Sequence, residues 1–263
     1  MILFNNEHLA IVSGSTRGIG FAIAESLYKE GISVIINGRT SESISLAIDK
    51  LKLSNPNANG KLIPFAANLC DSNEVSRLYE TYPNIDIVVN NIGIYGAAEF
   101  DEITDEEWMQ LFEINVMSGV RLSRKYLPLM KNRGWGRIVF ISSESAIQIP
   151  KEMIHYGMTK TAQLAISRGL AETCVNTGVT VNSILPGPTL TDGVKDFVKG
   201  LGGKSIEEFT EEYFETLRPS SIIKRFQSPE EIGDAVAFVC SERAASINGA
   251  AFRVDGGVVK ACF

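Results

Sequence analysis

Short runs of apolar residues alternate along this chain with segments in which apolar residues recur every three or four positions. Seven of the runs are rich in Val and Ile and almost continuously apolar, which is typical of strands buried on both faces of a sheet. They lie at residues 9–13, 33–37, 62–66, 85–90, 137–142, 179–185 and 250–254. Because helical segments separate the strands, the pattern predicts an α/β fold: a doubly wound parallel sheet of about seven strands with helices on both faces.

Three helix starts carry the Ser/Thr-x-x-Glu pattern of a capping box, in which each side chain bonds the main chain of the other residue. The pattern occurs at residues 104–107, 205–208 and 228–231. The last of these also has Pro229 at the first helical position, where a missing N–H is tolerated. No repeat or linker divides the sequence, so residues 1–263 are predicted to form one domain.

The segment 189–224 breaks the alternation, because it contains no strand candidate. It includes Gly200, Gly202 and Gly203, followed by an amphipathic helix predicted at 206–217. One face of that helix carries the apolar residues Ile206, Phe209, Tyr213 and Leu217. Because long insertions of this kind are usually functional or disordered, we interpret 189–224 as a substrate-binding lid hinged at the glycines. The alternative is a surface excursion with no gating role.

The composition narrows the class of protein. Hydrophobic residues make up 44% of the chain and charged residues 21%, which suits one soluble globular domain. The net charge is −6 and no Lys/Arg cluster occurs, which argues against a nucleic-acid partner. Four scattered cysteines and two histidines without ligand spacing argue against a disulfide framework and against a metal site. No signal-peptide pattern and no apolar run of membrane-spanning length is present, so a cytoplasmic protein without membrane contact is expected.

Candidate chemistry begins with Tyr156 and Lys160 in the run HYGMTK, with Ser143 thirteen residues upstream. Residues at i and i+4 share one face of a helix, so the ammonium would lie one turn from the phenol. A nearby cation favours the phenolate and makes the phenol a better acid. A serine hydroxyl alongside could hold a carbonyl oxygen against that phenol, which is the arrangement needed for proton transfer to an alcohol or ketone oxygen. The alternative for the pair alone is a surface helix with a chance cation–phenol neighbour.

A glycine-rich turn follows the first predicted strand and opens an apolar helix. Such a turn lets backbone N–H groups approach a pyrophosphate, and the helix N-terminus favours the anion, as in Rossmann-type folds. The predicted cofactor-binding residues of the turn are Gly14, Ser15, Thr16, Arg17, Gly18, Ile19 and Gly20. The spacing is G-x-x-x-G-x-G, and a simple turn without a ligand is the alternative.

The end of the second predicted strand indicates which dinucleotide the turn would bind. A site for NAD places a carboxylate there to bind the ribose 2′-hydroxyl, but this chain reads Ile-Asn-Gly-Arg-Thr, without an acid. Arg39 in this run and Arg17 in the glycine turn could pair with a 2′-phosphate from two sides. We therefore predict NADP(H), with NAD(H) as the less favoured cofactor. Two solvated surface arginines are the alternative.

Taken together, these residues resemble the short-chain dehydrogenase/reductase family over nearly the whole chain. The family's motifs match in order along the sequence. The matches are Ser13 to Gly20, Asn90-Asn91-Ile92-Gly93, Asn115, the group Ser143, Tyr156 and Lys160, Pro186-Gly187 followed by Thr189 and Thr191, and Phe252 to Gly257. Where the family usually has an acidic residue near the adenine, this chain has Asn68, followed by Leu69.

The resemblance implies a NADP(H)-dependent oxidoreductase that interconverts a ketone and a secondary alcohol. Tyr156 would be the general acid/base, Ser143 would bind the carbonyl, and Lys160 would hold the ribose and lower the pKa of the tyrosine. Asn115 would anchor a water that relays protons to Lys160. The remaining cofactor contacts implied by the resemblance are Asn68, Leu69, Asn91, Gly93, Pro186, Gly187, Thr189 and Thr191.

The resemblance also implies a homotetramer, with a dimer as the alternative, because family members pair their fourth and fifth helices. The helix predicted here from residue 155 to 174 is apolar on more than one face, which fits a second buried surface. Candidate pocket residues suggest a mostly apolar small-molecule carbonyl or alcohol: Ile94, Tyr95, Glu144, Gln148, Met153, Ile154, His155 and Leu190. Whether Glu144 enters the pocket or faces solvent is left open.

Two other functions are possible. One is 3-oxoacyl-(acyl-carrier-protein) reductase, although the acidic lid helix would repel an acidic carrier protein if it faced the entrance. The other is a non-catalytic NADPH-binding regulator, although such a protein would be expected to have lost part of the catalytic group.

Overall fold

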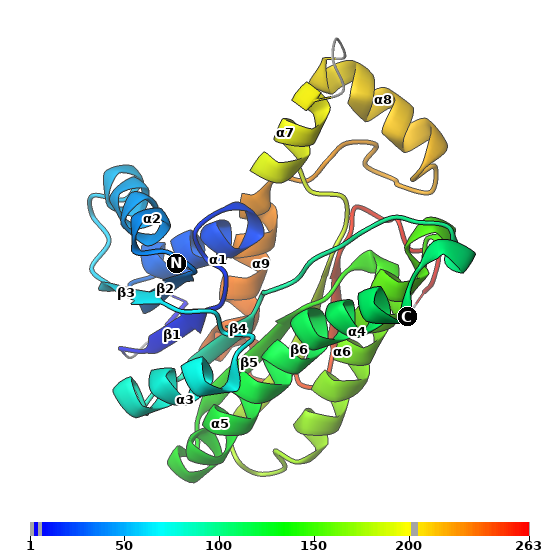
Figure 1. Ribbon diagram of the computed structural model, residues 1–263. Helices are drawn as coiled ribbons and strands as arrows, with labels where there is room; N and C mark the ends of the chain where they lie inside the picture. The colour runs from blue at the N-terminus through cyan, green and yellow to red at the C-terminus, as the bar shows by residue number, and fades with distance from the viewer. Residues whose placement is uncertain (1–2, 5–6, 201–204, 263) are drawn as a thin grey trace.

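The computed structural model describes residues 3–4, 7–200 and 205–262, and Figure 1 shows their arrangement around one sheet. The seven strands are all parallel and lie in the order β3-β2-β1-β4-β5-β6-β7. They are β1 Leu9–Val12, β2 Ser33–Gly38, β3 Leu62–Ala66, β4 Ile87–Asn90, β5 Gly136–Ile141, β6 Val179–Pro186 and β7 Ala251–Val254. The predicted α/β fold is confirmed, and each predicted strand is present, with ends that differ by at most two residues.

Burial explains why the strands could be recognised. Every residue of β4, β5 and β6 is buried, as expected for strands covered on both faces. The outermost strand β3 is instead partly exposed and contains Pro64. Proline cannot donate to a strand ladder, so it is tolerated at the edge of a sheet, where one side has no neighbour.

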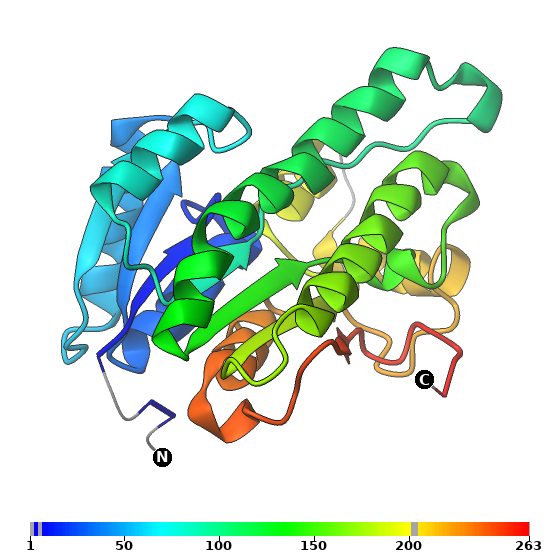
Figure 2. The same cartoon turned by 90° about the horizontal axis from the view of Figure 1, so that it is seen from below.

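Two helical layers cover the sheet, as Figures 1 and 2 show from two directions. One layer holds α1 Gly18–Lys29, α2 Ser41–Ser54 and α9 Pro229–Cys240, which bury the first apolar cluster against the sheet. The other holds α3 Ser72–Thr81, α5 Ser118–Arg133 and α6 Ile154–Glu172, which bury the second, and α4 Asp105–Phe112 packs against α6. The strand order reverses at β1, whose neighbours are β2 and β4. In a parallel sheet, the crevice beyond the carboxyl ends of the strands at such a reversal is the usual ligand site.

The three predicted capping boxes are present at the starts of α4, α8 and α9. At α8, Ser205 Oγ accepts from the N–H of Glu208 at 3.2 Å, and the Glu208 carboxylate accepts from the N–H of Ser205 at 2.9 Å. The N–H groups of Ser205 and Glu208, which have no partner within the helix, thereby gain hydrogen-bond acceptors. The helix therefore begins at a defined residue although it lies at the surface.

The segment 189–224 forms two helices beyond the carboxyl edge of the sheet, α7 Asp192–Gly200 and α8 Ile206–Thr216 (Figure 1). An aromatic cluster holds α8 in place: Phe226 stacks on Phe209 at 6.0 Å and lies 5.2 Å from Phe214, measured between ring centres. The predicted apolar face needs one correction, because Leu217 is 52% exposed whereas Phe214 is buried. The helix ends at Thr216, so Leu217 no longer follows its periodicity.

The predicted hinge is only partly within the described residues. Gly200 ends α7, and Gly202 and Gly203 lie outside the residues that the structure describes. Within the described ranges, no helix is both long and apolar enough to cross a membrane. The same residues contain no group of three or more His, Cys, Asp or Glu side chains that could hold a metal ion.

Candidate active site

The predicted catalytic side chains meet at the carboxyl ends of β4 and β5. Ser143 lies two residues beyond the end of β5, and Tyr156 and Lys160 lie on the first turns of α6. Lys160 Nζ donates to the main-chain oxygen of Ile141 at 2.8 Å and lies 5.6 Å from the centre of the Tyr156 ring. The helical spacing therefore brings the ammonium to the face of the phenol, as the sequence predicted.

The Ser143 hydroxyl sits between several polar groups. It bonds the phenol of Tyr156, accepts from the N–H of Ser145 at 3.1 Å and donates to the carboxylate of Glu144. Glu144 is only 5% exposed, so the side chain whose direction the sequence left open points inward. Ser143 and Tyr156 thus present two neighbouring hydroxyls to the crevice, which is the geometry needed to hold one carbonyl oxygen.

The pKa of Tyr156 is raised and Lys160 is not among the groups that shift it, so the prediction that Lys160 lowers this pKa is wrong for this structure. Burial is the largest cause and the negative charge of Glu144 is the next, whereas the hydrogen bond with Ser143 and the charge of Arg218 act in the opposite direction. The ammonium of Lys160 lies against a carbonyl oxygen rather than at the phenol oxygen. Burial also lowers the pKa of Lys160 to about 8.

Asn115 lies in a π-helical turn, Glu113–Met117, between α4 and α5. Its side chain is fixed by main-chain bonds with Ile94, at 2.7 Å to the N–H and 2.9 Å to the oxygen, and by Thr159 at 3.0 Å. The turn frees the main-chain oxygen of Asn115, which accepts from Gln163 Nε2 at 2.6 Å. Gln163 Oε1 in turn lies 3.5 Å from Lys160 Nζ. A π-turn at this point therefore connects Asn115 to Lys160, and such turns are frequent at functional sites.

The glycine turn is pinned at the start of α1. Asn37 Oδ1 accepts from the N–H of Gly14 at 3.1 Å, and Asn91 Nδ2 donates to the main-chain oxygens of Ser13 and Gly14 at 2.9 and 3.2 Å. Gly14 and Gly18 have φ of +66° and +58°, a region that disfavours other residues. No side chain caps the N-terminus of α1, and its first turn contains no acidic residue. These free N–H groups fit a pyrophosphate, whereas α2, α4 and α8 use a hydroxyl to satisfy theirs.

The predicted residues after β6 form a bonded loop that reaches this turn at Thr191. Gly187 donates to the oxygens of Val254 and Gln227 at 2.9 and 3.0 Å, directly after Pro186 ends the strand. Thr189 is buried, and its hydroxyl donates to Gly187 O at 2.9 Å. Thr191 approaches Gly18 so closely that a Cβ on that glycine would lie 3.6 Å from its methyl group. This loop therefore adjoins the phosphate-binding end of the crevice.

The residues predicted to bind the 2′-phosphate and the adenine differ in how accessible they are. Arg17 and Arg39 are exposed, and within the described part of the chain neither guanidinium forms a hydrogen bond or an ion pair. Asn68 is exposed as well, and its Oδ1 accepts from the N–H of Cys70 at 3.3 Å. Leu69 is fully buried in the core, so its side chain is not available to a cofactor and only its main chain could make the predicted contact.

Gly93 lies next to the catalytic lysine, because a Cβ built on Gly93 would be 3.4 Å from Lys160 Nζ.

Comparison with known proteins agrees with this arrangement. A family model described as enoyl-(acyl carrier protein) reductase matches residues 14–259. An uncharacterized oxidoreductase of Bacillus subtilis, YvaG, is 47% identical over 97% of both chains. Dehydrogenase/reductase SDR family member 4 of Caenorhabditis elegans is 31% identical over 95% of this chain and 94% of its own. The chain belongs to the short-chain dehydrogenase/reductase family.

A solved structure of another reductase shows how closely the fold is shared. L-Sorbose reductase from Gluconobacter frateurii, crystallised with NADPH and L-sorbose, superimposes with a TM-score of 0.91. The two are 32% identical, and the match covers 99% of this chain and 100% of that one. The family's fold binds NAD(P), and the uncapped start of α1 fits the pyrophosphate of such a dinucleotide.

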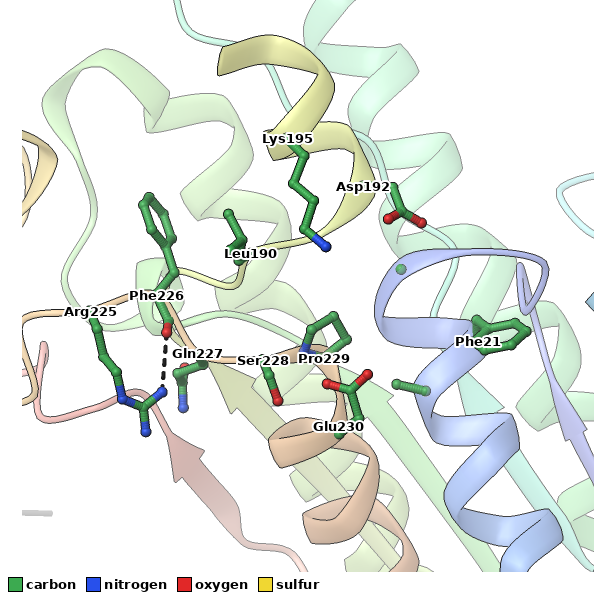
Figure 3. Close-up of a pocket in the computed structure, with 12 residues that line it drawn as sticks. Phe21, Leu190, Asp192, Lys195, Arg225, Phe226, Gln227, Ser228, Pro229 and Glu230 are labelled. Carbon is green, nitrogen blue, oxygen red and sulfur yellow. Dashed lines mark hydrogen bonds between the residues drawn. The ribbon is translucent and has the colours of Figure 1, made fainter. Parts of the chain in front are cut away.

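This short-chain dehydrogenase/reductase also has a cavity of about 370 Å³ between α1, α7 and the start of α9. Figure 3 shows Lys195 of α7 reaching into it above Ser228, Pro229 and Glu230. None of the predicted catalytic residues lines this cavity, so it is separate from the reacting groups. It separates α7 from α9 and from α1, the helix that begins at the phosphate-binding turn.

One residue near the catalytic group was missed by the sequence analysis. Arg218 follows α8 and is 9% exposed, and its Nε donates to Glu144 Oε1 at 3.0 Å. Little in the sequence indicates this contact, because an arginine just after a helix is common: its positive charge interacts favourably with the helix C-terminus. Only the fold shows that this cation meets the carboxylate next to Ser143.

Proposed function

We propose that the protein is an NADP(H)-dependent oxidoreductase that interconverts a ketone and a secondary alcohol, with Tyr156 as the general acid/base. The observation that carries the proposal is the meeting of Ser143, Tyr156 and Lys160 at the mouth of the crevice, beside a turn suited to a pyrophosphate. Two hydroxyls and an ammonium in this arrangement suit proton transfer to or from an alcohol or ketone oxygen.

Each residue has a distinct task in this proposal. A bound reduced dinucleotide supplies the hydride to the carbonyl carbon. Ser143 holds the carbonyl oxygen by a hydrogen bond, and Tyr156 donates its proton to that oxygen. Lys160 holds the ribose hydroxyls and keeps a positive charge near the phenol. Asn115, fixed by Ile94 and Thr159, positions Lys160 through Gln163 and anchors a water that returns the proton.

The raised pKa of Tyr156 bears on the resting protonation state of the phenol. A phenol with a raised pKa is protonated at neutral pH, which is the form that donates a proton to a carbonyl. Oxidation of an alcohol needs the phenolate, which burial and Glu144 disfavour. The resting phenol is therefore in the protonated form that a reduction step uses.

The segment 189–224 serves as the lid over the substrate in this proposal. Helices α7 and α8 stand beyond the crevice, and the cavity under α7 leaves room for that helix to approach the phosphate-binding turn. The homotetramer and the cytoplasmic location stay predictions, and light scattering of the purified protein would measure the assembly.

Cofactor choice is tested by removing the two exposed arginines. The variant Arg17→Ala with Arg39→Ala is expected to raise the KM for NADPH about 10- to 100-fold while changing the KM for NADH little, because only NADPH carries a 2′-phosphate for a guanidinium fork to bind. Steady-state kinetics with both dinucleotides measures the effect. Equal changes for NADPH and NADH would contradict the assignment.

The pH dependence of reduction is expected to report Lys160. Because burial lowers its pKa to about 8, the side chain is charged below that pH and neutral above it. Tyr156, with a raised pKa, stays protonated over the same range. The kcat/KM for NADPH, which reports groups of the free enzyme, should therefore fall above pH 8 and approach about a tenfold loss per pH unit.

The control for this profile is Lys160→Arg, whose side chain stays charged throughout. Whatever its absolute rate, this variant should show no decline between pH 7 and pH 10. A wild-type profile that is flat to pH 10 would contradict the role given to Lys160.

A screen of ketones with NADPH, followed by absorbance at 340 nm, tests the proposed function. Turnover of one or more ketones is the expected result. Failure across a broad panel together with tight NADPH binding would favour the non-catalytic regulator. A relative from Aquifex aeolicus, 3-oxoacyl-(acyl-carrier-protein) reductase, is 31% identical over 95% of this chain and favours one specific second candidate, a reductase of 3-oxoacyl-(acyl carrier protein). Acetoacetyl-(acyl carrier protein) should be in the panel, and a preference for it would support that candidate.

A further inference from the structure

A buried ion pair joins the lid segment to the catalytic serine. Arg218 Nε lies 3.0 Å from Glu144 Oε1, and both residues are at least nine-tenths buried. The other carboxylate oxygen of Glu144 accepts from the Ser143 hydroxyl and from the N–H of Ser145, the latter at 2.9 Å. Because Ser143 bonds Tyr156, the ion pair lies one side chain away from the proton-donating phenol. A substrate held by Ser143 and Tyr156 would therefore contact this pair.

The charges around Arg218 do not balance. Glu152 Oε1 approaches Arg218 Nη1 at 3.9 Å, so two carboxylates face a single guanidinium. Nη1 donates to the oxygen of Leu217 at 2.9 Å, and among the described residues no hydrogen-bond partner meets Nη2. The corner therefore offers carboxylate oxygens that accept hydrogen bonds, the two N–H groups of Nη2 that can donate, and one more carboxylate than guanidinium.

These features discriminate between classes of ketone. An apolar ketone would cover the buried ion pair without offering it any hydrogen bond, which is unfavourable. A keto acid would add a third carboxylate to a corner where two carboxylates already face one guanidinium, and like charges repel. A hydroxyl group avoids both costs, because it donates to a carboxylate and accepts from a guanidinium N–H. A neutral substrate with hydroxyl groups next to the reacting carbon suits the corner best.

We propose that the substrate is a neutral polyhydroxylated ketone whose hydroxyl groups are recognised by Glu144 and Arg218. This inference rests on the proposed function, since it names the substrate class of the same site. It departs from the mostly apolar substrate that the sequence suggested, because the sequence did not reveal that Glu144 turns inward or that Arg218 reaches it.

Three ketones of four carbons test the proposal with NADPH. L-Erythrulose carries hydroxyl groups around its carbonyl, 2-butanone carries none, and acetoacetate carries a carboxylate. The wild-type protein is expected to reduce L-erythrulose with a kcat/KM at least about 100-fold above that of either other ketone, as expected when a site built for hydroxyl groups meets a substrate without them. A higher value for 2-butanone or acetoacetate would overturn the inference.

A double variant tests whether the ion pair between Glu144 and Arg218 causes the preference for L-erythrulose over 2-butanone. Removing one partner would leave the other charge buried and could unfold the protein, so Glu144→Gln and Arg218→Met are combined to remove both charges. The ratio of kcat/KM for L-erythrulose to that for 2-butanone should fall at least about 30-fold. An unchanged ratio would overturn the inference, and NADPH binding by fluorescence verifies that the variant is folded.

The matched control removes an exposed Arg–Glu pair instead. Arg168 and Glu172 on α6 are both more than half exposed, and the variant Arg168→Met with Glu172→Gln should keep the wild-type ratio. The inference and the proposed function fail in different ways. Turnover of other ketones but not of L-erythrulose overturns only the substrate class, whereas no turnover of any ketone overturns both.

Discussion

Replacing Tyr156 with phenylalanine is expected to lower kcat for ketone reduction by about 10²- to 10⁴-fold, the range typical of losing a general acid. Phenylalanine keeps the aromatic ring and its contacts. The ring centre of Tyr95 lies 6.4 Å away, edge-on, and the ammonium of Lys160 lies 5.6 Å away. Only the hydroxyl that donates the proton is lost. NADPH affinity, measured by fluorescence titration, should therefore stay close to the wild-type value.

A second tyrosine provides a matched control. Tyr126 on α5 is fully buried, and its hydroxyl has no hydrogen-bond partner in the described structure. Tyr126→Phe removes the same atom from a site far from the crevice, so kcat should be unchanged and the stability unchanged or slightly higher. Substantial turnover by Tyr156→Phe, at a level similar to Tyr126→Phe, would show that another group supplies the proton.

The parts of this molecule that sequence alone predicted are those governed by local pattern. The strand β5 is buried along its whole length, so its apolar run was visible. The capping box at Ser205 uses residues three apart, and the spacing of Tyr156 and Lys160 is one helical turn. In each case the interacting residues are close in sequence, so their geometry follows from a helix or a strand.

The parts that sequence missed depend on residues distant along the chain. Arg218 and Glu144 are 74 positions apart, and nothing in either local pattern indicates that they meet. The raised pKa of Tyr156 has the same origin, because burial and the inward carboxylate of Glu144 together outweigh the Ser143 hydrogen bond and Arg218. The π-turn at Asn115 was also hidden, since its extra residue leaves the helical periodicity almost intact.

Gly20→Ala is expected to raise the Kd for NADPH about 100-fold and to lower the free energy of unfolding by about 1–3 kcal/mol, as overpacking of a tight site usually does. A Cβ at this position would lie 2.4 Å from the main-chain oxygen of Gly14 and 2.5 Å from Asn91 Nδ2. Neither atom can move freely, because Asn91 Nδ2 bonds the oxygens of Ser13 and Gly14. The turn that presents N–H groups to the pyrophosphate would have to shift instead.

Gly169→Ala separates this steric effect from the general effect of replacing a helical glycine. Gly169 lies within α6, and a Cβ there would meet no atom within 4 Å. Because alanine favours a helix over glycine by up to about 1 kcal/mol, this control should raise the thermal midpoint and leave the Kd for NADPH unchanged. If Gly20→Ala instead bound NADPH as tightly as the wild-type protein, the glycine turn at the start of α1 would not be where the phosphates bind.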